Sequence, residues 1–153
     1  MDLDTIKADI FGKTLTGLGL NLIVRDVPRH VSFLKDNFDM KAFRATNDFA
    51  ILKYTDQIFQ LHADHTYGRH PLFGILPENP PRGAGIEIRL YNSDPDECHR
   101  RAVARGDSIL HPPLDKPHGL RECAILSHDG YVWIPSRPLA ECICDNYGLS
   151  QGN

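Results

Sequence analysis

Histidine residues in the first half of the chain are the first residues whose types and spacing suggest chemistry. His62 follows Gln60 by two positions, so in an extended segment both side chains face the same side. His65 and His70 follow in the adjoining loop. Neutral imidazole is the commonest nitrogen ligand of transition metals, so a divalent metal ion centred on Gln60 and His62 is one hypothesis. Because no carboxylate or thiol stands in a clear fourth place, we favour solvated loop histidines, or one histidine that lines a pocket.

Polar and aromatic side chains at strand spacing form a second candidate set. Glu87, Arg89 and Tyr91 alternate with aliphatic residues, which predicts a strand with one polar face. An indole, an amide, a carboxylate and guanidinium groups suit a planar, partly polar guest, on which Trp133 stacks while Glu87 or Arg89 fixes its orientation. The residues that we expect in this ligand-binding cleft are Asn21, Arg25, Gln60, His62, Glu87, Arg89, Tyr91 and Trp133.

A purely structural role for the same residues stays open. In that alternative, Glu87 and Arg89 form ion pairs with Arg25 or Glu122, and Trp133 is a core residue. The sequence contains no G-x-S-x-G motif, and its glycines do not form a dinucleotide-binding fingerprint. Catalytic residues therefore stay unassigned, and a binding protein is favoured over an enzyme.

The elements that must position these side chains are clearest between Gly83 and Pro138. An alternating segment predicts a strand, Asp94 begins a helix, and Gly106 ends that helix. Two further strands follow, one on each side of the turn at His128–Gly130.

The first half of the chain repeats this plan in a less regular form. The alternation over Leu18–Val24 predicts a strand, Asp26 caps a helix, and three short strand-like runs follow. We therefore expect an α+β fold in which two βαβββ modules form a curved mixed sheet around a cleft. The expected organisation is an N-terminal arm (1–16), a first module (17–63), a connector (64–82), a second module (83–138) and a C-terminal tail (139–153).

Composition and charge exclude several classes of protein. Hydrophobic residues make up 41% and charged residues 24% of the chain, which is typical of a globular protein. A net charge of -3 gives no reason to expect nucleic acid as a partner. No apolar run approaches the roughly 20 residues of a membrane span, and the opening segment lacks the features of a secretory signal. We expect a cytoplasmic protein without a membrane partner.

The cysteines fit a reducing compartment. The chain contains four, namely Cys98, Cys123, Cys142 and Cys144. Cys142 and Cys144 form a C-x-C motif, but no further ligand lies at zinc-site spacing. We expect buried or idle thiols.

Short motifs along both halves resemble the vicinal oxygen chelate superfamily, which includes glyoxalase I, extradiol dioxygenases, and the fosfomycin- and bleomycin-resistance proteins. They are Val24–Asp26, Ala104–Asp107 and the hairpin Asp129–Tyr131. Pro117–Glu122 is similar to a segment of the bleomycin-resistance branch. The resemblance spans about residues 17–138 and implies paired βαβββ modules.

The resemblance also implies where a metal would bind. Enzymes of the superfamily usually hold a divalent ion with ligands from the first and last strands of each module. These places fall on Gly19 and Gly85, on Gln60, and on Ile134 or Trp133, of which only Gln60 could coordinate a metal. Because this sequence departs from the family pattern at these places, we expect a metal-free cleft without a cofactor that binds a small, planar or aromatic molecule, for sequestration or resistance.

Two alternatives stay open. One is a metal-dependent lyase or dioxygenase of the same superfamily with a shifted site around Gln60 and His62. The other is a scaffold dimer without a ligand. The resemblance and the apolar connector segment Leu72–Leu76 both favour a homodimer.

Overall fold

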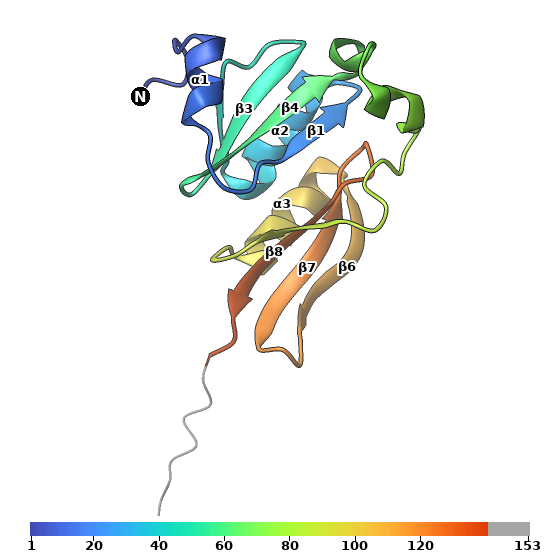
Figure 1. Ribbon diagram of the computed structural model, residues 1–153. Coiled ribbons are helices and arrows are strands. Elements are labelled where there is room, and N and C mark those ends of the chain that lie inside the picture. Colours follow the sequence, from blue (N-terminus) through green and yellow to red (C-terminus); the bar gives the residue numbers. More distant parts are fainter. Residues whose placement is uncertain (141–153) are drawn as a thin grey trace, which may run out of the picture.

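Two four-stranded mixed sheets make up the β-structure of the computed structural model, which describes residues 1–140 (Figure 1). The first sheet has the order β1-β4-β3-β2 and contains β1 (Asn21–Val24), β2 (Lys41–Phe43), β3 (Phe49–Tyr54) and β4 (Gln57–Ala63). The second has the order β5-β8-β7-β6 and contains β5 (Glu87–Leu90), β6 (Ser108–Asp115), β7 (Leu120–Leu126) and β8 (Val132–Pro138). In each sheet the strands that come first and last along the chain, β1 with β4 and β5 with β8, pair in parallel. The predicted α+β fold of two βαβββ modules is confirmed.

Each module carries one helix that begins and ends where the sequence predicts. Asp26 caps α2 (Val27–Phe38) by accepting a hydrogen bond from the Arg29 backbone N–H. Asp94 caps α3 (Pro95–Arg105) in the same way, and Gly106 follows it with a φ of 79°. The predicted N-terminal arm contains a third helix, α1 (Ala8–Thr14). None of the described helices is long and apolar enough to span a membrane.

A single hydrophobic core joins the two modules. Helices α2 and α3 contact each other, and buried residues of both sheets belong to one cluster. Leu34 and Phe38 of α2 pack in this cluster with Leu61 of the first sheet and Ile125 and Trp133 of the second. Each sheet therefore has a core face and an opposite face, which we call its outer face.

The N-terminal arm packs on the outer face of the first sheet. Leu3 and Phe11 are buried against Ile51 of β3, with Phe43 and Phe49 at the edge of this small cluster. The outer face of the first sheet is thus covered on one side by the chain's own first residues.

Two strands differ from the sequence-based expectation. The βαβββ plan requires a strand directly after α3, but no residues were assigned to it from the sequence; it is β6, which contains Pro112 and Pro113, residues that are rare inside strands. The two prolines are tolerated because β6 is an edge strand, and its pairing register with β7 shifts on both sides of His111. β1 begins only at Asn21, and the side chain of Leu18, predicted to be part of its aliphatic face, is 100% exposed.

The connector is ordered and contains two short 3-10 helices, η1 (Asp64–Tyr67) and η2 (Pro71–Ile75). Arg82, at its end, donates two hydrogen bonds to the Asp64 carboxylate, with N–O distances of 2.5 and 2.8 Å. This pair closes the connector into a loop.

Candidate ligand-binding site

Three of the predicted site residues lie together on the outer face of the first sheet. Asn21 of β1 is in register with Gln60 of β4, and His62 lies two residues further along the same strand. Tyr67 approaches this group: its hydroxyl lies 3.4 Å from Asn21 Nδ2, and its ring centroid lies 5.3 Å from that of His62. Burial lowers the pKa of His62, and its buried Nε2 has no hydrogen-bond partner.

Glu87 and Arg89 form a charged network on the outer face of the second sheet. The Arg89 guanidinium contacts the buried Glu122 carboxylate and lies 3.1 Å from Glu87. His118 Nε2 lies 3.3 Å from the same Glu122 oxygen. Burial alone would raise the pKa of Glu122, but the hydrogen bonds from Arg89 and His118 outweigh it and lower the pKa. The structural alternative anticipated the pairing of Arg89 with Glu122 but not that of Arg89 with Glu87, and Arg25 pairs with Asp129 instead.

Arg25 leaves the predicted cleft and turns into the junction between the modules. Its Nε donates to Asp129 Oδ1 at 2.5 Å, and its backbone N–H donates to Oδ2 at 2.9 Å. Its Nη2 also donates to the His128 carbonyl oxygen at 2.7 Å. Because β1 ends at Val24, the alternation that placed Arg25 beside Asn21 no longer holds at this position.

Trp133 lies on the core face of β8, because Arg89 is in register with Ile134 and those two share the outer face. The indole is 0% exposed and is surrounded by Phe33, Phe38 and Phe59, with ring centroids at 6.5, 5.9 and 5.8 Å. Protein side chains therefore surround the indole ring on which we expected a ligand to stack. Its Nε1 is buried and has no hydrogen-bond acceptor.

A cavity of about 760 Å³ lies between the modules, and we call it the inter-module cavity. Its walls come from the segment before β1, from the turn between β3 and β4, and from β5. Three predicted residues border it: Arg89, Tyr91 and Trp133. Its apolar lining includes Leu18, Leu20, Ile58, Phe59 and Ile88. A volume of this size suits a small organic molecule.

Tyr54 ties the two modules together at one end of this cavity. Its hydroxyl donates a 2.6 Å hydrogen bond to the backbone oxygen of Tyr91, and Arg89 lies over the Tyr91 ring at 5.9 Å. Sequence reasoning missed Tyr54 and Phe59 as cavity residues. The periodicity of β3 and β4 places both in strands, but it carries no signal that the ends of these strands face the second module.

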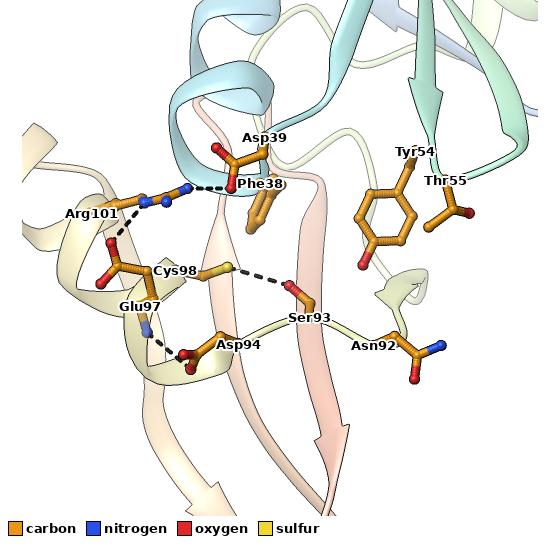
Figure 2. A pocket seen from close by; sticks show the side chains of 10 residues that line it. All are labelled: Phe38, Asp39, Tyr54, Thr55, Asn92, Ser93, Asp94, Glu97, Cys98 and Arg101. Atoms are coloured by element: carbon orange, nitrogen blue, oxygen red, sulfur yellow. Dashed lines mark hydrogen bonds and ion pairs between the residues drawn. The ribbon is translucent and has the colours of Figure 1, made fainter.

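A smaller pocket of about 330 Å³ adjoins the inter-module cavity and shares Tyr54 with it (Figure 2). Its charged groups are paired with one another. Arg101 bridges Asp39 at 2.7 Å and Glu97 at 3.0 Å, and Cys98 Sγ lies 3.5 Å from Ser93 Oγ (Figure 2). Because these groups already have partners, we assign no ligand to this pocket.

The described cysteines are both buried thiols. Cys98 and Cys123 are free, and burial raises the pKa of Cys123 to about 12, so its reactive thiolate form is scarce at neutral pH. Cys142 and Cys144 lie outside the described residues.

Comparison with known proteins identifies a family model that matches this chain and solved structures that share its fold. The model of the glyoxalase/bleomycin resistance protein/dioxygenase superfamily matches residues 18–134. A search of curated protein sequences gives no match.

Solved structures share the fold at low identity. A glyoxalase/bleomycin resistance protein/dioxygenase family enzyme from Burkholderia phytofirmans PsJN superimposes with a TM-score of 0.67 at 15% identity, over 79% of this chain and 97% of that chain. For TioX from Micromonospora sp. ML1, the TM-score is 0.58 at 23% identity, over 82% and 100%. For the fosfomycin resistance protein FosX from Mesorhizobium loti, it is 0.59 at 17% identity, over 82% and 95%.

Proposed function

Because the chain belongs to the glyoxalase/bleomycin resistance protein/dioxygenase superfamily, we propose that it binds a small molecule in the inter-module cavity without a metal ion and works by sequestration. The observation that carries this proposal is the inter-module cavity, which is bordered by Trp133, a residue whose buried indole N–H has no acceptor. An unpaired buried donor is destabilising, so a ligand acceptor that reached it would restore a missing hydrogen bond.

The lining specifies the class of ligand. The aliphatic side chains and Phe59 suit a planar apolar body, and Arg89, whose two terminal nitrogens contact Glu87 and Glu122, has further N–H donors for an acceptor group of the ligand. Tyr91, which is 55% exposed, lines the cavity next to Arg89. We therefore propose an aromatic molecule that carries a carboxylate or a similar acceptor.

Thermal unfolding in the presence of planar aromatic carboxylates and matched neutral amides tests this proposal. A ligand at about one hundred times its dissociation constant should stabilise the protein by roughly 2.7 kcal/mol. Arg89→Lys retains a positive charge for Glu122 but loses the planar fork, so we expect the carboxylate to bind roughly tenfold more weakly. Arg100→Lys on the exposed side of α3 is the matched control and should bind normally. If no compound of either series stabilises the protein, a scaffold role is favoured instead.

A second candidate is a metal-dependent lyase or dioxygenase with its ion at Gln60 and His62. The neutral, unpartnered His62 imidazole favours it. However, among residues 1–140 no group of three His, Cys, Asp or Glu ligand atoms at metal-binding separation includes His62. If this candidate is right, His62→Ala should abolish metal binding, as measured by zinc and iron titration, and with it any lyase or dioxygenase activity. If the variant binds metal like the wild type, this candidate is eliminated.

We also propose that two copies of the chain form a homodimer. β1 and β5 are edge strands, and apolar side chains near them, including Leu18 and Ile86, are exposed. Leu18→Glu places a charge in this surface and should shift the protein to monomers in light scattering coupled to gel filtration. Val103→Glu, at an exposed position of α3, should leave the mass unchanged. A monomeric wild-type protein at micromolar concentration would rule out the dimer.

A further inference from the structure

The turn between β7 and β8 brings two histidines and an aspartate together where the modules meet. His30, on α2, is fully buried, and neither of its ring nitrogens has a hydrogen-bond partner. The His30 and His128 ring centroids lie 4.9 Å apart, and His30 Nδ1 lies 3.8 Å from Asp129 Oδ2. One ligand atom from each residue lies within 4.8 Å of the other two. In the described part of the chain, no second group of three His, Cys, Asp or Glu residues has this arrangement.

We propose that His30, His128 and Asp129 bind one divalent transition-metal ion of the zinc type, which links the two modules. This inference does not depend on the proposed ligand, because none of the three residues borders the inter-module cavity. Two imidazoles and one carboxylate match the ligands that zinc uses with a water molecule in the fourth position. Calcium and magnesium prefer six or more oxygen ligands, which this site does not offer.

The distances fit a site that closes slightly around the ion. In a four-coordinate zinc site with bonds of about 2.0 Å, ligand atoms lie roughly 3.3 Å apart. His30 Nδ1 and Asp129 Oδ2 are 3.8 Å apart and the three ligand atoms all lie within 4.8 Å of one another, so the side chains would have to move closer together around an ion. His128 is half-buried, and its Nε2 is buried without a hydrogen-bond partner, as both ring nitrogens of His30 are.

The charge states of His30 and Asp129 suit a cation. Burial lowers the pKa of His30 to about 3, and the neighbouring His128 adds to this effect, so the ring is in the neutral form that binds metals. Burial alone would raise the pKa of Asp129, but the two hydrogen bonds from Arg25 outweigh it and keep the carboxylate ionised.

Arg25 orients the proposed ligand carboxylate rather than neutralising the site. It donates one hydrogen bond to each Asp129 oxygen, as outer-shell partners of metal ligands do. Its side chain is 37% exposed, so water solvates much of its charge. Each carboxylate oxygen retains a lone pair, and the one on Oδ2 is available to an ion beside His30.

Titration of the chelator-treated full-length protein with zinc chloride tests the proposal. We expect one zinc ion per chain by calorimetry and a higher thermal midpoint, because the ion binds the folded state. His128→Asn should weaken zinc binding by more than about 100-fold, since loss of an outer-shell partner alone costs 10- to 100-fold. His118→Asn is the control, because His118 also lies beside a buried carboxylate but outside the cluster.

Ring-nitrogen NMR of the zinc-loaded wild-type protein identifies the ligands independently of any variant. Shifts of both His30 and His128 on zinc addition support the site, even if His128→Asn fails to fold. Zinc shifts confined to other histidines overturn it. Failure of the wild type to bind zinc also overturns it, and ordered water then satisfies the histidine nitrogens.

Discussion

Replacement of Gly130 by alanine is expected to reduce the free energy of unfolding by about 3 kcal/mol, measured by urea denaturation. Gly130 has a φ of +82°, which costs an L-residue about 1–2 kcal/mol. A Cβ atom at this position would also lie 2.5 Å from Pro81 Cα. Because a backbone atom cannot rotate away as a side chain does, the turn or the connector must move. Overpacking of this kind costs about 1–3 kcal/mol.

Gly119→Ala is the matched control for this substitution. Gly119 has a φ of +86°, but a Cβ atom there would meet no other atom within 4 Å. It therefore carries only the backbone cost of about 1–2 kcal/mol. The difference between the two variants measures the contact of the turn with the connector. If both variants lost the same free energy of unfolding, the connector would move away from the added methyl group without cost. The contact between the turn and the connector would then contribute nothing to stability.

The local elements of this fold could be predicted because they follow local rules. Asp26, Asp94 and Gly106 bound the helices by capping chemistry that needs no tertiary contact. The residues of β6 were not assigned from the sequence, and only the place of this strand at the sheet edge makes Pro112 and Pro113 acceptable in it. The exposure of Leu18 likewise depends on where the chain enters β1, which alternation alone does not determine.

The candidate site was harder to predict because it depends on which face of each strand meets the core. Alternation shows that Trp133 and Ile134 face opposite ways, but the register with β5 decides which of them shares a face with Arg89. A shift of one residue exchanges the two roles. Arg89 and Tyr91 lie near each other because both lie on or beside one strand. The junction of His30, His128 and Asp129 involves residues about one hundred positions apart, and no local pattern brings them together.

The two proposed sites require separate measurements. The metal-free cavity predicts no effect of chelators on the binding of aromatic ligands, whereas the junction cluster predicts bound zinc. Zinc content alone therefore does not distinguish an enzyme of this superfamily from a binding protein with a structural ion. The His62 and His128 variants do distinguish them, because His62 lies on the outer face of the first sheet and His128 lies in the β7–β8 turn.

Asp64→Asn is expected to destabilise the protein by about 3 kcal/mol, although asparagine preserves the size of the side chain. The Arg82 side chain is 1% exposed, and the Asp64 carboxylate accepts hydrogen bonds from both of its terminal nitrogens. The amide removes the charge and one acceptor, so a buried guanidinium remains without its counterion. Weaker contacts to the carbonyl oxygens of Ile23 and Glu78, at 3.4 and 3.1 Å, cannot replace a full negative charge.

The control for Asp64→Asn is Asp96→Asn, which removes the carboxylate from a similar two-pronged pair with Arg121. The N–O distances in that pair are 2.8 and 2.7 Å, but both side chains are partly exposed and Asp115 also contacts Arg121. Water and the second carboxylate compensate for the lost charge, so Asp96→Asn should have little effect on urea unfolding. The contrast depends on burial, because the two pairs have nearly the same geometry. If both variants lost the same free energy of unfolding, burial of the Arg82–Asp64 pair would not be what makes this pair stabilise the connector.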